Sequence, residues 1–394
     1  MTKRKVLLYI CVFALIGGAA FFFLHDRAGT DTLGNSAQST TNAPEWSSLK
    51  AEGKLPLQYA NQFTVTNYED GYKFIEITGS GKYLLVPEGK AVPKGLEKDV
   101  VVLHQPLDRI YLAATSAMDL FRALDGVGNI RFSAVNVSGW YIDAAKQAMK
   151  EGSMLYAGKY SAPDYELISS GGCDLAIEST MIFHTPEVKE QLEHLGVPVL
   201  VERSSYESNP LGRMEWLKLY GVLLGKEAQA EELFQKELNA LSGITGQAST
   251  GKTVAFFYIT TTGSVNVHKS GDYVAKMIEM AGGKYIFYDL GDNGNALSTM
   301  NMQMEEFYNT AKDADVLIYN SAIDGELQTM DELTAKSPLL ADFKAVKSGD
   351  VWCTGKDLFQ EPMGLGKMIT DMHTVLTEVD PDPNGLTYLH RLKK

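Results

Sequence analysis

Residues 206–245 read YESNPLGRMEWLKLYGVLLGKEAQAEELFQKELNALSGIT, and they decide the fold because they predict a helix between two strand-rich halves. Apolar side chains recur in this stretch at close to every 3.6 residues. Asn209 followed by Pro210 supplies a helix start, and Gly243 supplies a stop. A helix of roughly 30 residues would be about 45 Å long. We therefore predict a single long helix that joins two lobes.

On both sides of this helix, strand-like runs alternate with segments of helical periodicity. This alternation begins with the strand-like run 109–115. It starts again with the strand-like run 253–259 and continues with the run 316–320. Alternation of this kind is typical of parallel sheets whose two faces are covered by helices. We predict an α/β protein with two Rossmann-like lobes, residues 55–205 and 246–394, each built on a parallel sheet.

The N-terminus predicts export from the cytoplasm. Basic residues at positions 3–5 precede an uncharged apolar run that ends at Leu24 and, at about 19 residues, is long enough to cross a bilayer. The basic flank places that end in the cytoplasm. We predict that residues 1–24 are a transmembrane anchor or signal peptide and that residues 25–54 are a flexible tether. The rest then lies outside the cell membrane, or free in the periplasm if the signal is cleaved.

Charge and cysteine content narrow the possible partners. The net charge of −13 argues against nucleic acid, which requires a basic surface. Cys11 lies in the apolar run, and we interpret it as an apolar filler because Ile10 is not the small residue that a lipoprotein signal needs. Cys173 and Cys353 fall one in each lobe, so we predict free thiols rather than a disulfide that would lock the lobes together.

Motifs for catalysis, cofactors and metals are weak. Residues 246–253 match the P-loop pattern GxxxxGK[ST], but here a helix leads in and a strand leads out, which reverses the order that phosphate binding requires. The seven histidines are scattered, without an HExxH motif or a close set with metal-ligand spacing. No GxSxG motif is present. We predict no catalytic residues, no cofactor and no metal ion held directly by the protein.

Three segments carry a family resemblance. WLKLYGVLLGKEAQAEELFQKEL (216–238) is similar to a linking-helix pattern, lGxllGkexxAexL. PDYELISSGGCDLAI (163–177) resembles a segment that ends in a PD strand, and residues 272–320 resemble its second-lobe repeat. The chain thus resembles the helix-linked substrate-binding proteins of ABC transporters (periplasmic binding protein class III), which carry iron–siderophore complexes, haem or cobalamin. GCD and DAD replace the two PD pairs, and residues 55–103 lie outside the resemblance.

The resemblance implies a binding protein and not an enzyme. It would capture an iron chelate (a siderophore complex or haem) or a corrinoid between its lobes and deliver it to an ABC permease dimer with its ATPase. In that family, one glutamate ahead of each PD strand pairs with permease arginines. The matching residues are Glu166 in the first lobe and Glu305 or Glu306 in the second. An exported enzyme, a transporter protein that binds a divalent metal directly, and a structural surface protein without a ligand remain alternatives.

Ligands of open α/β sheets bind beyond the carboxyl ends of the strands, so residues that follow the predicted strands are candidates for a cleft between the lobes. Their aromatic, cationic and hydroxyl side chains suit a bulky ligand that is partly anionic and partly apolar. The predicted ligand-binding residues are Ser116, Trp140, Lys159, Tyr160, Glu178, Arg203, Tyr258, Thr260, Asn320 and Lys356. Arg213, Tyr206 and Glu207 are further candidates, although helix capping explains Glu207 equally well.

Overall fold

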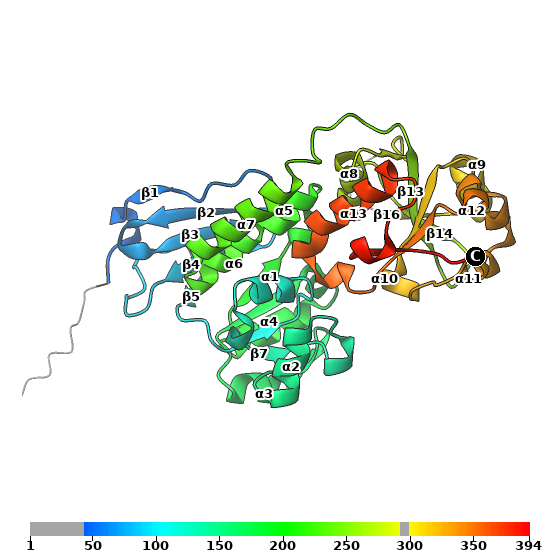
Figure 1. Cartoon of the computed structure of the whole chain (residues 1–394). Coiled ribbons are helices and arrows are strands. Elements are labelled where there is room, and N and C mark those ends of the chain that lie inside the picture. The colour runs from blue at the N-terminus through cyan, green and yellow to red at the C-terminus, as the bar shows by residue number, and fades with distance from the viewer. Residues whose placement is uncertain (1–42, 292–298) are drawn as a thin grey trace, which may run out of the picture. The chain divides into compact units, whose positions relative to one another are not determined.

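A computed structural model describes residues 43–291 and 299–394 (Figure 1). The predicted anchor, with Cys11, and the tether up to residue 42 lie outside these residues. Residues 43–54, which we assigned to the tether, instead contain the 3-10 helix η1 (Trp46–Ser48) and the strand β1 (Ala51–Lys54). Within the described ranges, no helix is both long enough and apolar enough to cross a membrane.

Residues 51–104 form a sheet of their own ahead of the first α/β lobe. The order is β1-β2-β3-β4-β5; the first four strands are antiparallel neighbours, and β5 runs parallel to β4. The strands after β1 are β2 (Phe63–Tyr68), β3 (Lys73–Ile77), β4 (Gly81–Val86) and β5 (Val100–His104). Val65 and Ile75 on one face join a hydrophobic core that continues into Leu112 of the first lobe and Trp216. The sheet and the first lobe therefore share one core.

The first lobe contains an all-parallel sheet, which confirms the predicted alternation. Its order is β12-β11-β6-β7-β8. The strands are β6 (Ile110–Leu112), β7 (Ile130–Ser133), β8 (Leu155–Tyr156), β11 (Leu175–Ser179) and β12 (Val199–Glu202), with a small hairpin of β9 (Gly158–Lys159) and β10 (Ala162–Pro163). The helices are α1 (Ala117–Ala123), α2 (Asp143–Glu151), α3 (Tyr165–Ser170) and α4 (Pro186–His194).

The sheet of the second lobe is mixed, so the prediction of a parallel sheet was only partly right. Its central strands are parallel, but a tight turn after β13 folds the next strand back beside it, and two more strands are antiparallel to their neighbours. The strands are β13 (Thr253–Ile259), β14 (Val265–His268), β15 (Lys284–Tyr285), β16 (Thr299–Met302), β17 (Val316–Tyr319), β18 (Val351–Thr354) and β19 (Leu389–Arg391).

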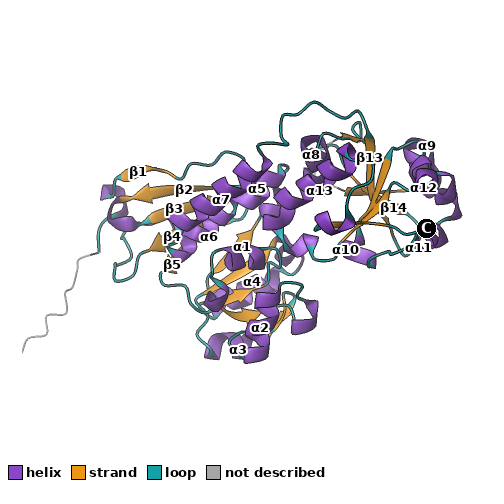
Figure 2. Ribbon diagram, in the orientation of Figure 1, coloured by secondary structure: helices purple, strands orange, loops and turns teal. Residues whose placement is uncertain are grey.

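Helices lie against this sheet on both sides (Figure 2). They are α8 (Tyr273–Met280), α9 (Met304–Ala311), α10 (Ser321–Asp324), α11 (Met330–Lys336), α12 (Lys344–Ser348) and α13 (Leu365–Thr377). The short 3-10 helices η4 (Val137–Gly139), η8 (Leu358–Gln360) and η9 (Pro362–Gly364) take part in contacts between the lobes.

The prediction of one long helix over 206–245 is wrong, because this stretch forms three helices. They are α5 (Pro210–Glu215), α6 (Leu217–Leu224) and α7 (Glu227–Leu241). Gly225 ends α6 with a φ of 67°, a left-handed conformation that glycine adopts without steric cost. The chain then turns back, so that α6 and α7 lie side by side (Figure 1). A Cβ at Gly221 would come within 2.6 Å of the Ala230 Cβ, so this close approach requires glycine.

A buried carboxylate at the junction of α5 and α6 ties the N-terminal sheet to these helices. The Glu215 side chain is 0% exposed and accepts hydrogen bonds from the backbone N–H groups of Gln58, Tyr59 and Ala60, at 2.9, 2.8 and 2.8 Å. The Lys218 ammonium lies 3.0 Å from the same carboxylate. The lysine also donates to the Pro56 carbonyl oxygen. The chain that leads into β2 is thus held by its own backbone.

A second carboxylate extends this arrangement. Glu207 accepts hydrogen bonds from the N–H groups of Asn61 and Gln62, both through Oε1, at 3.0 and 2.9 Å. It also accepts from Trp216 Nε1 at 3.0 Å. Because both carboxylates are buried, each needs these donors to offset the loss of water. Together the two carboxylates bind the backbone N–H groups of residues 58–62 and hold this segment against the helices.

We expect Glu215→Ala to lower the free energy of unfolding by about 3–5 kcal/mol, because it leaves a buried lysine and three backbone donors without their carboxylate. Urea unfolding followed by circular dichroism measures the change. Glu231→Ala is the matched control: it removes the other carboxylate that pairs with Lys218, at 2.9 Å, but that side chain is 44% exposed. Its cost should stay under about 1 kcal/mol. Equal costs for the two variants would contradict the anchoring role of Glu215.

Candidate functional site

A pocket with a volume of ≈ 290 Å³ lies where the carboxyl ends of the first-lobe strands face the second lobe. Its first-lobe wall consists of hydroxyl groups and one carboxylate, whereas its second-lobe wall is aromatic and apolar. The first-lobe residues are Thr115, Ser116, Ser179, Glu202, Ser204 and Ser205. The second-lobe residues are Tyr273, Leu358, Phe359, Pro362 and Leu365, and Arg213 comes from α5. We call this pocket the interlobe cleft.

Strand register explains why some strand-end residues reach the cleft and others do not. Ser179 of β11 is paired with Glu202 of β12, and both line the cleft. The preceding pair, Glu178 and Val201, points to the other face of the sheet because successive side chains of a strand alternate. Val201 there belongs to an apolar cluster with Tyr111.

Arg213 is fixed at the edge of the cleft by three contacts. Its guanidinium carbon lies 3.5 Å from the ring centroid of Tyr273 at the start of α8. Its Nε donates to the Glu207 carbonyl oxygen at 3.1 Å, and one terminal nitrogen donates to the Ser205 carbonyl oxygen at 2.6 Å. The guanidinium is therefore held as a planar surface beside an aromatic ring and not as a freely moving cation.

Backbone and side-chain hydrogen bonds join the two lobes beside the cleft. The Gln360 Oε1 accepts from the Tyr141 N–H at 2.7 Å, and the Gln360 Nε2 donates to the Gly139 carbonyl oxygen at 2.8 Å. The Met363 N–H donates to Asp119 Oδ2 at 2.9 Å. The rings of Tyr141 and Phe359 meet edge to face, with centroids 6.0 Å apart. We call these contacts the interlobe contact.

Burial raises the pKa of two carboxyl groups near the cleft. Glu202 is 2% exposed, and its Oε1 accepts from the Ser204 N–H at 2.8 Å. Burial raises the pKa of Glu202, while its hydrogen bonds to Ser204 and the nearby Arg213 lower it. Burial also raises the pKa of Glu178 to about 8. Neither carboxyl oxygen of Glu178 has a hydrogen-bond partner among the described residues.

Of the ten predicted ligand residues, Ser116 lines the cleft. Trp140 and Glu178 are 1% and 0% exposed, so neither contributes surface to the cleft in this structure. The indole of Trp140 packs in the first-lobe core, and its Nε1 donates to Ser133 Oγ at 3.2 Å. Arg203 lies over the Tyr206 ring, at 3.9 Å from its centroid, instead of lining the cleft.

The other six predicted residues are not among those that line the cleft. Lys159 belongs to β9, and Tyr160 lies in the turn that follows it. Tyr258 lies in β13, and Thr260 closes the β13–β14 turn through a hydrogen bond to the Ser264 carbonyl oxygen. In the remaining two cases, Asn320 caps α10 and the Lys356 N–H donates to Glu326 Oε1.

Several cleft residues escaped sequence reasoning. Glu202, the last residue of β12, and Ser204 line the cleft on either side of the predicted Arg203, which itself does not. Tyr273 is the first residue of α8 and Phe359 lies within η8, so neither follows a strand and the strand-end rule does not point to them. Arg213, a secondary candidate, lines the cleft.

The docking candidates are exposed and occupy similar positions in the two lobes. Glu166 lies in the first turn of α3, and Glu305 and Glu306 lie in the first turn of α9. The aspartates that follow these helices have matching roles. Asp174 Oδ2 accepts from the Arg109 N–H at 2.9 Å beside β6, and Asp315 Oδ2 accepts from the Thr253 N–H at 2.7 Å in β13. GCD and DAD thus keep the aspartate that fixes the central strand of each lobe.

The P-loop-like segment and the two cysteines of the lobes lie within the described residues. The P-loop-like segment 246–253 follows α7 and leads into β13, so a strand follows it, as predicted. Cys173 and Cys353 are unpaired. Across residues 43–291 and 299–394, no group of three or more His, Cys, Asp or Glu side chains has an arrangement that could hold a metal ion.

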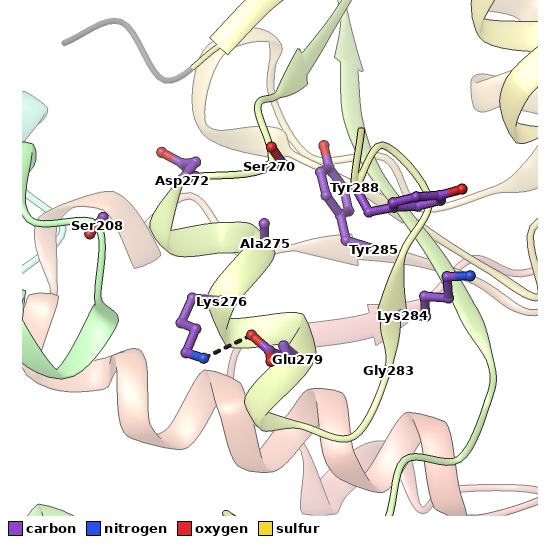
Figure 3. Close-up of a pocket in the computed structure, with 11 residues that line it drawn as sticks. Ser208, Ser270, Asp272, Ala275, Lys276, Glu279, Gly283, Lys284, Tyr285 and Tyr288 are labelled. Carbon is purple, nitrogen blue, oxygen red and sulfur yellow. Dashed lines mark hydrogen bonds and ion pairs between the residues drawn. The ribbon is translucent and has the colours of Figure 1, made fainter. Parts of the chain in front are cut away.

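A second hollow, with a volume of ≈ 360 Å³, lies along α8 of the second lobe (Figure 3). Lys276 and Glu279 of this helix line it and form an ion pair at 2.8 Å. The Lys284 ammonium lies 4.8 Å from the ring centroid of Tyr288. Ser208, which precedes α5, faces the hollow from the opposite side (Figure 3). Because its charged lining residues are largely matched with neighbours, we regard the interlobe cleft as the stronger candidate site.

Comparisons with known proteins agree with the two-lobed architecture. Residues 110–358 match the family described as periplasmic binding protein. An uncharacterized lipoprotein of Methanocaldococcus jannaschii is 30% identical over 378 residues, which cover 87% of this chain and 86% of that protein.

Two solved structures share the fold. The periplasmic haem-binding protein HutB of Vibrio cholerae has a TM-score of 0.55 and 17% identity, over 68% of this chain and 99% of that one. The petrobactin-binding protein YclQ of Bacillus subtilis has a TM-score of 0.54 and 12% identity, over 69% and 92% of the two chains. With the family match over 110–358, these findings confirm the predicted resemblance: the chain belongs to the periplasmic binding protein family.

Proposed function

We propose that this protein is the substrate-binding component of an ABC importer. It captures an iron chelate, either a siderophore complex or haem, or cobalamin in the interlobe cleft and delivers it to the permease dimer and its ATPase. The observation that carries the proposal is the position of the cleft, which lies beyond the carboxyl ends of β6, β11 and β12 and is closed by the second lobe. This is where open α/β sheets bind their ligands. The haem and petrobactin named for the two similar structures support the ligand class.

The same proposal assigns a cellular location. Residues 1–24 hold the protein at the outer face of the cell membrane, or direct its release into the periplasm if they are cleaved. The lipoprotein name of the relative from Methanocaldococcus jannaschii supports a tethered protein. Residues 25–42 then serve as the tether, and the binding domain begins near residue 43.

Glu166, Glu305 and Glu306 are the proposed contacts with the permease. Each is exposed, each lies in a first helical turn, and each helix precedes the aspartate that fixes a central strand. The two lobes thus present similar acidic points, as a permease with two similar subunits requires. The helix dipole alone also favours acidic residues in a first turn, so exposure and repetition, rather than charge, support the assignment.

Ligand binding is the first test of this proposal. Purified protein is titrated with ferric siderophores, haem, cobalamin and free divalent metal ions, and the fluorescence of its tryptophans is recorded. We expect at least one chelate to bind with a Kd below about 1 µM, equivalent to about −8 kcal/mol. Arg213→Ala should weaken that binding, whereas Lys252→Ala, in the P-loop-like loop, should leave it unchanged. Tight binding of bare zinc or manganese with no chelate bound would contradict the proposal.

Permease docking is tested separately. Combined Glu166→Ala, Glu305→Ala and Glu306→Ala should reduce uptake through the transporter while ligand affinity stays intact, since desolvated ion pairs at an interface can contribute several kcal/mol. Glu187→Ala is the matched control, because Glu187 is an exposed residue in the first turn of α4. Uptake of radioactive iron chelate by cells that express each variant at equal level is the measurement. Normal uptake by the triple variant would rule out the docking assignment.

A further inference from the structure

The charge of the interlobe cleft is close to balanced. Among the described residues that line it, Glu202 and Arg213 carry the charges, one of each sign. Five of the first-lobe lining residues are serine or threonine, whose neutral hydroxyls both donate and accept hydrogen bonds. The second-lobe wall offers apolar surface and two aromatic rings. A ligand in this cleft therefore meets many neutral hydrogen-bonding groups and a single cation.

That cation is already engaged by the protein. The guanidinium of Arg213 donates to two backbone carbonyl oxygens and lies against the ring of Tyr273. Carbonyl oxygens and the face of an aromatic ring replace part of the hydration shell of the guanidinium. Fewer of its N–H donors are therefore free to stabilise an incoming anion.

Two carboxyl groups lie directly behind the cleft. Glu202 is buried beside the Ser204 N–H, and Glu207, which is 1% exposed, lies close enough to interact with it electrostatically. Asp119, at the interlobe contact, is buried and forms an ion pair with Arg122, so this pair adds no net charge. An anion in the cleft would approach the carboxyl groups of Glu202 and Glu207 in surroundings that screen charge weakly. Because burial raises the pKa of both groups, the repulsion grows as the pH rises and they lose their protons.

The field of the whole chain has the same sign. Its net charge of −13 slows the approach of polyanions and favours uncharged or cationic ligands. This long-range effect does not depend on the local geometry of the cleft, and it too favours uncharged ligands over polyanions.

We propose that the interlobe cleft selects chelates without net negative charge, such as ferric trihydroxamates or corrinoids, over polyanionic chelates such as ferric tris-catecholates. This selection rests on the proposed ligand-binding function. Hydroxyl groups on the first lobe bind the polar edge of the chelate, and the aromatic and apolar wall covers its apolar face. Glu202 is the residue that excludes anions, because a bound anion would lie near its carboxylate in a site that holds no unengaged cation among its described lining residues.

The test compares chelates of matched size and different charge. Full-length protein is titrated at pH 7 with an uncharged ferric trihydroxamate, cobalamin, haem and a triply negative ferric tris-catecholate. We expect the trihydroxamate or cobalamin to bind on the order of 100-fold more tightly than the tris-catecholate. A tris-catecholate that binds as tightly as either would overturn the selection but leave the proposed function intact. Failure of all four to bind would instead count against the proposed function.

A variant pair isolates the charge of the cleft. Glu202→Gln keeps the acceptor for the Ser204 N–H but removes the negative charge, so the affinity for the tris-catecholate should rise about 10-fold relative to that for the uncharged chelate. Glu178→Gln is the matched control. It changes a buried carboxyl on the neighbouring strand that faces the opposite side of the sheet, and it should leave the affinity ratio unchanged. An unchanged ratio in Glu202→Gln, with circular dichroism showing a folded protein, would overturn the role of Glu202.

Discussion

The carboxylate of Glu215 is the constraint on which the arrangement of this molecule depends. A buried carboxylate is tolerated only when its lone pairs are satisfied, and here three successive backbone N–H groups and one ammonium satisfy them. Residues 58–60 must therefore cross the junction of α5 and α6, and the sheet that follows packs on the same helices as the first lobe. Because α5 also carries Arg213, the same anchor sets one edge of the interlobe cleft.

The alternation of strands and helices was predictable because it depends on local periodicity. The break at Gly225 was not, since α6 and α7 both carry apolar faces and the period of 3.6 residues continues through the turn. Glycine is tolerated within helices at a cost of about 1 kcal/mol, so its presence does not by itself identify a turn. The back-folded β14 escaped prediction for a related reason: a short turn at 260–264 leaves no mark on the periodicity of the flanking strands.

The cleft was harder to predict than the fold, since a shift of one residue along a strand reverses the direction of a side chain. Glu178 and Ser179 show this, because they are adjacent in β11 and only Ser179 lines the cleft. Trp140 illustrates a second difficulty: an aromatic residue beyond a strand can belong to the core or to the ligand surface, and only tertiary packing decides. Ser116 could be placed because it lies in the short loop after β6, where it is the N-cap residue of α1.

The interlobe contact through Gln360 has a consequence for the motion of the two lobes. One side-chain amide binds a backbone carbonyl and a backbone N–H of the first lobe, so the contact does not depend on which side chains occupy those two positions. When the lobes separate, water can take over each of these hydrogen bonds, and the net free-energy cost per bond is only about 1 kcal/mol. The interlobe contact therefore consists of weak hydrogen bonds that water can replace. A bound molecule that touches both walls of the cleft would shift the equilibrium toward the closed arrangement of the lobes.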